Sequence, residues 1–174
     1  MQESEENKMS AEAGVSSLGI RLGYGVSTRN AVPTAFEWLE RVNSIGGVSL
    51  STEQIDASAL EDMISRYIQG RQDTGGTWEI TFNLSNDVVT QLDGLIEEYQ
   101  GMGDGEVMWF EVWSPYMKQA FMIIAQVPAN IPMPESGQNS LWTVALSLTI
   151  EEYKGLMEGV KPVHADGSGE EEGA

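Results

Sequence analysis

Strict alternation of apolar and polar residues is the feature that most constrains the fold of this chain. Between residues 77 and 84, Trp78, Ile80 and Phe82 alternate with hydroxyl, carboxylate and amide side chains. Residues 141–151 repeat the pattern over a longer stretch, with small and hydroxylated residues opposite the apolar ones. A period of two is typical of a strand that buries one face. The pattern therefore predicts an antiparallel sheet, to which residues 18–24 also belong.

Two further segments, residues 107–113 and 120–127, are apolar on both sides. Pro115 lies between them in a sequence suited to a turn, so we expect the two segments to pair as a hairpin. A strand that is buried on both faces lies either between two layers or under a subunit contact.

One helix is predicted over residues 87–99. Ser85 or Asn86 can cap it, Asp87 suits its first turn, and an apolar stripe follows at helical spacing. At about 13 residues such a helix is marginal alone, so it must dock on the sheet. The expected fold is mainly β (α+β): an antiparallel β-sandwich or partly closed barrel with one packed α-helix and a long inter-strand loop.

The long loop covers residues 46–76 and has weak periodicity. Loops of that length in a compact domain are uncommon and are typically functional or bound to a partner. We expect a helical turn or two over residues 57–68. Outside the loop, residues 18–156 form the domain, and the polar ends 1–17 and 157–174 are predicted to be flexible acidic arms.

The charge is strongly negative, with 27 acidic and 9 basic residues and a net charge of −18. Residues 14–156 alone hold 18 acidic and 7 basic residues, so the predicted domain shares in the excess. Such a field disfavours binding that follows nucleic-acid phosphates. Solubility alone is the other reading of the charge.

Composition excludes several kinds of site. The chain has no cysteine and one histidine, His164, which excludes disulfides, thiolate metal sites and a histidine-based triad within one chain. No metal or other cofactor is predicted. No apolar run approaches the roughly 20 residues that span a bilayer, and the acidic N-terminus is unlike a signal peptide. We expect synthesis in the cytoplasm and no membrane anchor.

No catalytic residue is predicted. Glu106 with Glu111, or Glu79 with Glu111, are the carboxylate pairs to consider, but the sequence gives no environment that would separate their pKa values. A solvated acidic face is the favoured reading. Trp109 and Trp113 share a side with Glu111, and burial at a subunit interface is favoured over a carbohydrate platform.

The central pattern resembles the major tail tube protein of long, non-contractile-tailed (siphovirus-type) bacteriophages. Four short motifs carry the resemblance, in matching order and spacing. They are SIGGVSL (44–50), EQIDASALED (53–62), RYIQG (66–70) and GTWEITFN (76–83). With the helix and strands that follow, the resemblance covers about residues 18–150.

The resemblance implies a structural, non-enzymatic virion protein of the phage tail. Its subunits would form hexameric rings that stack into a tube, with tape measure, tail terminator and baseplate or tip proteins as partners. Genomic DNA would pass through an acidic lumen without specific binding. Ring closure would also remove open sheet edges, which are an aggregation hazard.

Two sets of residues are the site candidates on this reading. The long loop would contact the neighbouring ring through opposite charges, and acids on polar strand faces would line the lumen. The predicted inter-ring contacts are Asp56, Glu61, Asp62, Arg66, Arg71 and Asp73. The predicted lumen acids are Glu37, Glu79 and Glu111.

Two alternatives stay open. A related tube or ring component, such as a contractile-tail, secretion-tube or tail-completion protein, would share these features. A carbohydrate-binding β-sandwich using Trp109 and Trp113 is less favoured.

Overall fold

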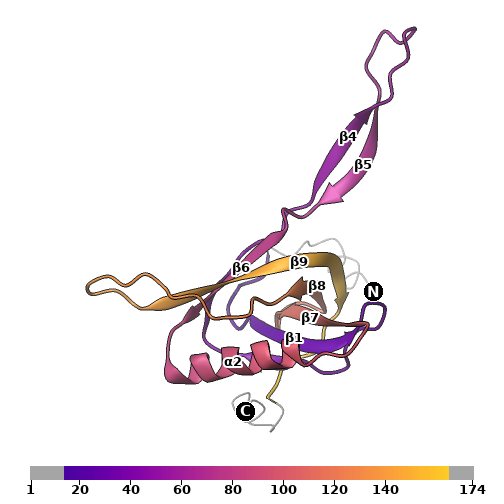
Figure 1. Ribbon diagram of the computed structural model, residues 1–174. Helices are drawn as coiled ribbons and strands as arrows, with labels where there is room; N and C mark the ends of the chain where they lie inside the picture. Colours follow the sequence, from indigo (N-terminus) through magenta and orange to yellow (C-terminus); the bar gives the residue numbers. More distant parts are fainter. Residues whose placement is uncertain (1–13, 165–174) are drawn as a thin grey trace, which may run out of the picture.

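The computed structural model describes residues 14–164 and contains a seven-stranded antiparallel sheet, a separate two-stranded hairpin and one helix (Figure 1). The helix is α2 (Asn86–Gln100). The strands are β1 (Arg21–Thr28), β2 (Glu37–Leu39), β3 (Val42–Ile45), β4 (Ser51–Asp56), β5 (Tyr67–Asp73), β6 (Thr77–Asn83), β7 (Glu106–Trp113), β8 (Gln119–Gln126) and β9 (Thr143–Glu158). The predicted mainly β class with one helix is confirmed.

The large sheet is curled into a partly closed barrel. Its strand order is β2-β1-β7-β8-β9-β6-β3, so β2 and β3 lie at opposite edges. Only Glu40 and Arg41 separate these two strands in the sequence, which requires the edges to approach each other. Gln91 on α2 holds this junction, because its side chain accepts a hydrogen bond from the Glu40 N–H at 2.8 Å and donates to the Glu40 carbonyl at 3.2 Å.

The main core fills the inside of the barrel. Trp78, Ile80 and Phe82 of β6 are at most 1% exposed, which confirms the predicted alternation. In β9, Val144, Leu146, Leu148 and Ile150 are buried as predicted, although the strand begins at Thr143 and continues to Glu158. Trp142, predicted on the same inward face, precedes the strand and is 47% exposed. The indole N–H of Trp78 also donates to the Gly46 carbonyl at 2.7 Å. This bond ties the start of the segment after β3 to the core.

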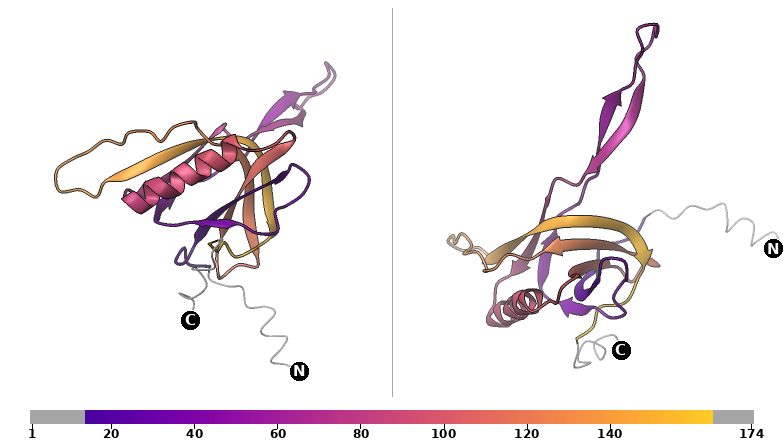
Figure 2. Two further views of the ribbon diagram at one scale, coloured as in Figure 1. Left: turned by 60° about the horizontal axis from the view of Figure 1, so that its bottom comes forward. Right: turned by 45° about the vertical axis from the view of Figure 1, so that its right-hand side comes forward.

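Helix α2 covers one opening of the barrel (Figure 2). It begins at a cap in which the Ser85 hydroxyl accepts from the Val88 N–H at 3.2 Å, and it ends at Gly101. Its buried stripe joins the main core. The predicted helix, its cap and its end are therefore confirmed.

Strands β7 and β8 pair as predicted and are covered on both faces. Their outward residues belong to a second apolar cluster with Val32 and Phe36 from the loop after β1. Residues 159–164, which we call the strap, lie over the same region. The Val163 N–H donates to the Phe36 carbonyl at 3.1 Å, and Val163 accepts from the Trp38 N–H at 3.1 Å. The second layer over this hairpin is therefore part of the same chain.

Gly23 on β1 explains how the strap approaches so closely. A Cβ at this position would lie 2.8 Å from Pro162 and 2.9 Å from Phe36. The sequence placed the start of a flexible tail at residue 157, but residues 157 and 158 lie in β9 and the strap packs on the body. The remaining predicted arm residues, 1–13 and 165–174, lie outside the described residues.

The predicted long loop is a β-hairpin that projects from the body (Figures 1 and 2). We call β4, β5 and their connection the arm, residues 51–73. Ile55 lies opposite Ile68 across the pair. The helical turns expected over residues 57–68 are wrong beyond one hydrogen-bonded turn, from the Asp62 N–H to the Ala59 carbonyl at 3.0 Å. Neither face of the hairpin is buried, so its sequence carries no apolar alternation and predicts a loop instead of strands.

Candidate functional site

The arm is exposed along its whole length. No residue from 51 to 73 is buried, and neither apolar cluster of the described residues 14–164 has a member in the arm. A two-stranded hairpin that packs on nothing is marginally stable in water. Contact with a partner would therefore stabilise the arm more than any other element of this fold.

The end of the arm presents large apolar side chains to solvent. Leu60 and Met63 are fully exposed, and Ile64 is 79% exposed. We call these three residues the arm tip. Single exposed apolar residues are ordinary, but several on one projection mark an interaction site.

Hydrogen bonds within the turn fix the shape beneath the arm tip. Asp62 accepts from the Ala59 N–H at 2.8 Å, and the Ser58 hydroxyl accepts from the Arg66 N–H at 2.8 Å. Asp56 accepts from the Ser58 N–H at 2.9 Å, and its hydrogen bonds with Ser58 lower the pKa of the Asp56 carboxyl. The polar side chains thus fold the turn, and the apolar ones are left facing outward.

The predicted inter-ring charges divide between the two ends of the arm. Asp56, Glu61, Asp62 and Arg66 lie towards the tip, and Arg66 pairs with Asp62 at 3.4 Å. The other two, Arg71 and Asp73, lie in β5 towards the body, where Asp73 accepts from the Gly75 N–H at 2.9 Å. Asp56, Asp62 and Asp73 therefore accept hydrogen bonds within turns of their own chain. Contact of any of them with another ring stays a prediction.

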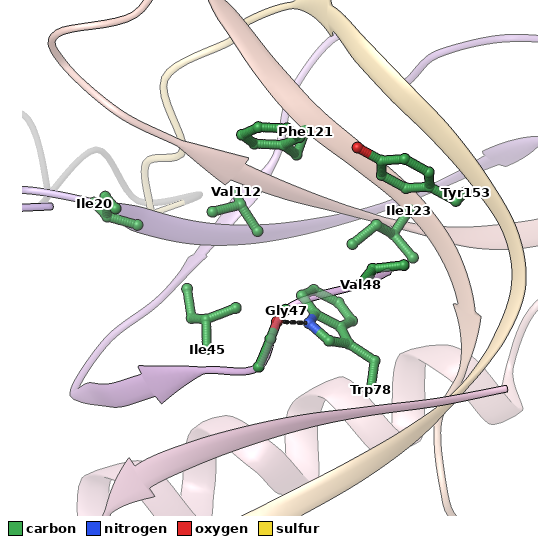
Figure 3. Close-up of a pocket in the computed structure, with 10 residues that line it drawn as sticks. Ile20, Ile45, Gly47, Val48, Trp78, Val112, Phe121, Ile123 and Tyr153 are labelled. Carbon is green, nitrogen blue, oxygen red and sulfur yellow. Dashed lines mark hydrogen bonds between the residues drawn. The ribbon is translucent and has the colours of Figure 1, made fainter. Parts of the chain in front are cut away.

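A second apolar feature lies where the arm joins the body. A cavity of about 340 Å³ opens there between the ends of β1, β3, β7 and β8 (Figure 3). We call it the mouth. Its lining is Ile20, Ile45, Gly46, Gly47, Val48, Trp78, Val112, Phe121, Ile123 and Tyr153.

The rim of the mouth is apolar and accessible. Ile20 is 39% exposed and Phe121 is 38% exposed, and Leu156 lies directly opposite Phe121 in the β8–β9 register. A neighbouring hollow of about 220 Å³ shares Ile20, Val112 and Phe121 with the mouth and extends the apolar surface to Val15. The mouth and this hollow together form one continuous, open apolar depression on the surface.

The outer face of β6 and β9 is polar. Glu79 lies opposite Ser147 and Thr77 opposite Thr149, so carboxylate and hydroxyl groups line up across the two strands. Glu79 is exposed and faces a shallow hollow that also contains Glu135. Of the predicted lumen acids, Glu79 is the one on this face, which we call the polar face.

Glu37 lies elsewhere, on β2 at one edge of the sheet. Its carboxylate is 3.4 Å from Nδ1 of His164, and Nε2 of His164 is 2.9 Å from the Glu40 carboxylate. The hydrogen bond with Glu40, followed by that with Glu37, raises the pKa of His164. The strap therefore ends in a histidine held between two carboxylates.

Glu111 is not a lumen acid, because its side chain is completely buried. One carboxyl oxygen, Oε2, accepts from the Val160 N–H of the strap at 3.1 Å, and the other, Oε1, has no hydrogen-bond partner among the described residues. Burial raises the pKa of Glu111 to about 7. The sequence pattern places Glu111 among Trp109 and Trp113, but it cannot show that residues 49 positions away cover it.

The segments that cover Glu111 also bury Trp109, so Trp109 and Trp113 do not form an exposed carbohydrate platform. Trp109 is 1% exposed, and its indole N–H donates to the Thr28 carbonyl at 3.1 Å. Glu106, the other partner considered for Glu111, accepts from the Gly103 N–H in the turn before β7. Glu111 is a buried carboxyl beneath the strap, and neither acid pair is assembled around it.

Two groups of site residues were missed by sequence reasoning, the arm tip and the mouth. The signal for the first was present, since Leu60, Met63 and Ile64 flank the acidic pair Glu61 and Asp62. The mouth had no local signal, because its walls come from five separate strands.

Within residues 14–164, no group of three His, Cys, Asp or Glu side chains is placed to hold a metal ion. In the same described part, no helix is long and apolar enough to cross a membrane.

Comparison with known proteins gives structural neighbours of low sequence identity. No family model matches the chain, and no curated protein matches it. The chain is similar to a chain of the tail of an empty gene transfer agent particle with C6 symmetry, at TM-score 0.47 and 14% identity, over 72% of this chain and 87% of that one. It is also similar to a chain of the six-fold symmetrised anti-feeding prophage baseplate, at TM-score 0.48 and 11% identity, over 86% of this chain and 98% of that one. At these scores, function has to follow from the chain's own residues.

Proposed function

We propose that this chain is a structural, non-enzymatic subunit of a phage-type tail that assembles into stacked hexameric rings and forms the tail tube. The observation that carries the proposal is the projecting arm with its exposed apolar tip. Exposing these side chains to water is unfavourable, and a partner that covered them would recover about 1.5–3 kcal/mol for each one fully buried.

The position of the arm also supports assembly beyond a dimer. The arm projects from the body on one side, and we propose that it meets a surface of the neighbour other than the neighbour's arm. Contacts between unlike surfaces produce closed rings or open filaments, depending on whether the rotation closes. The number six, the passage of DNA and the tape measure, terminator and tip partners come from the resemblance at residues 44–83.

For the wall of the tube we propose the polar face of β6 and β9, with Glu79 as its acidic residue. Hydroxyl and carboxylate groups on this face would stay hydrated, and negative charge repels phosphates without binding them. Replacing Glu79 with Lys in every subunit should therefore make assembled tubes retain duplex DNA at low salt and release it at high salt. Retention equal to that of unmodified tubes would remove Glu79 from the wall.

The proposal as a whole is tested by removing the arm. The full chain is expected to form long tubes of uniform bore under negative-stain microscopy. A variant in which a short Gly-Ser turn replaces residues 51–73 should remain monomeric with an unchanged melting temperature, because neither described apolar cluster includes an arm residue. Normal-length tubes from this variant, or a strictly monomeric full chain at all concentrations, would contradict the proposal. Single rings in place of tubes would favour the related ring component.

A further inference from the structure

The chain carries an apolar projection and an apolar opening that do not meet within one molecule. The arm points away from the body in every view, so its tip lies apart from the mouth at its root (Figures 1 and 2). The tip exposes Leu60, Met63 and Ile64, and the mouth exposes Ile20 and Phe121 at its rim. Among residues 14–164, neither surface is therefore covered by another part of the same molecule.

We infer that the arm tip of one copy inserts into the mouth of a second copy. The inference rests on the proposed stacking and identifies the surface that receives the arm. The two surfaces agree in chemistry, since both consist of branched aliphatic, thioether or aromatic side chains. They also agree in form, because a narrow turn meets an open cavity of about 340 Å³.

Because the arm tip and the mouth lie at opposite ends of the arm, the same tip-to-mouth contact can repeat from copy to copy in one direction. The mouth lies at the root of the arm, so each copy offers its own mouth to a third copy after its tip is bound. Ten residue steps separate Leu50 at the root from Leu60 at the tip, which limits the spacing of successive copies to at most about 35 Å plus the depth of insertion. A projection and a cavity on different parts of one chain give an open-ended assembly when the rotation between successive copies does not close into a ring.

The occupant that we infer is a second copy, because the chain itself exposes an apolar projection that matches the apolar lining of the mouth. Within the tip turn, Arg66 pairs with Asp62, and the exposed surface beside this pair consists of the three apolar residues of the arm tip and Glu61. The mouth is lined almost wholly by apolar side chains and glycines, with the Tyr153 hydroxyl as its polar group. An insertion of Leu60, Met63 and Ile64 that leaves the exposed Glu61 at the rim would bury no unpaired charge there.

A cysteine pair tests the contact directly, because the chain has no cysteine of its own. Copies carrying Met63→Cys and copies carrying Ile20→Cys are mixed and oxidised. A disulfide between the two kinds of copy is expected. In the matched control, Ser147→Cys on the polar face replaces Ile20→Cys, and no such link is expected. Equal cross-linking of the two pairs would overturn the inference.

Substitutions at the tip give an independent measurement. A variant with Leu60→Ser, Met63→Ser and Ile64→Ser should raise the concentration needed for assembly at least about 100-fold, since each buried apolar side chain is worth roughly one to two factors of ten. Its melting temperature should not change. The control variant, Met133→Ser with Leu141→Ser, changes two exposed apolar residues outside both surfaces and should assemble normally.

The outcomes separate this inference from the proposed function. Tubes of normal length from the tip variant would overturn the inference and leave the tail tube proposal standing. A specific tip-to-mouth disulfide without any tube would support the contact and count against the tube. A monomeric full chain that forms no disulfide would overturn both. Removal of residues 1–13 should leave the yield of the disulfide unchanged, whereas a disulfide that forms only after their removal would assign the mouth to that segment instead.

Discussion

Strands β5 and β6 are each seven residues long and lie three residues apart in the sequence, yet their surroundings differ completely. In β6, every second side chain is buried against the core, including Trp78 at 1% exposure. In β5, no side chain is buried. Strand β6 is therefore stabilised by burial of its side chains in the body. Strand β5 is held by its hydrogen bonds with β4 until a partner covers it. The body is stabilised by its own core, whereas the arm is an exposed hairpin available for contact with a partner.

The largest effect is expected from one substitution made in both regions. Leu92→Ala in helix α2 should lower the free energy of unfolding by about 2–5 kcal/mol, because Leu92 is completely buried in the main core. Leu60→Ala at the arm tip should change it by less than about 0.5 kcal/mol. Urea denaturation of dilute protein measures both. Similar losses from the two variants would break the distinction between body and arm.

The next effect concerns the body and its strap. The folded protein raises the pKa of Glu111 from 4.5 to about 7, so the proton is bound more tightly in the folded state. Stability is therefore lost as pH rises from about 5 through 7, and each pKa unit corresponds to about 1.4 kcal/mol. We expect a loss of about 2–4 kcal/mol between pH 5 and pH 8.

Glu111→Gln should remove most of that pH dependence, because the amide stays neutral and can still accept from the Val160 N–H. The measurement is urea denaturation against pH in the background of the tip variant, which keeps the protein monomeric. An unchanged pH dependence in Glu111→Gln would show that Glu111 is not the titrating group.

His164 at the end of the strap should act in the same direction with a smaller effect. Its raised pKa stabilises the folded protein below pH 6.5, and the contribution is lost as pH rises through the higher folded value. His164→Ala should cost about 1 kcal/mol at pH 5 and almost nothing at pH 9. An NMR titration of the His164 ring checks the direction. A folded pKa below 6.5 would contradict the placement of the ring between Glu37 and Glu40.

The smallest effect is expected from the ion pair in the arm. Arg66 approaches Asp62 at 3.4 Å, and the Arg66 side chain is 76% exposed. Exposed pairs of this kind contribute about 0–1 kcal/mol. Arg66→Ala should leave the melting temperature of the monomer unchanged in a calorimetric scan, and a shift of several degrees would place the arm in the same cooperative unit as the body.

The contrast between the two regions also explains what could be predicted from sequence. The alternation at Trp78, Ile80 and Phe82 records burial on one face, so the strand could be recognised. The cap at Ser85 and the apolar stripe identified the helix in the same way. The strands of the arm bury neither face and leave no such periodicity, so the sequence predicts a loop there.

The candidate site was predicted in part for a similar reason. The charges around Asp62 and Arg66 could be seen in the sequence, but their pairing with each other depends on the turn. The alternation along β7 shows which side of the strand Glu111 lies on. That the Val160 N–H donates to its carboxyl group depends on the fold. Burial by distant segments is a property of tertiary packing and is not encoded in any local pattern.

Amide hydrogen exchange of the arm, compared between dilute monomer and assembled protein, tests the central claim most directly. We expect the amides of residues 51–73 to exchange rapidly in the monomer, while those of β6 and β9 are protected, and we expect assembly to protect the arm tip most strongly. Strong protection of the arm in the dilute monomer, or an arm tip that remains unprotected in the assembled state, would contradict that claim.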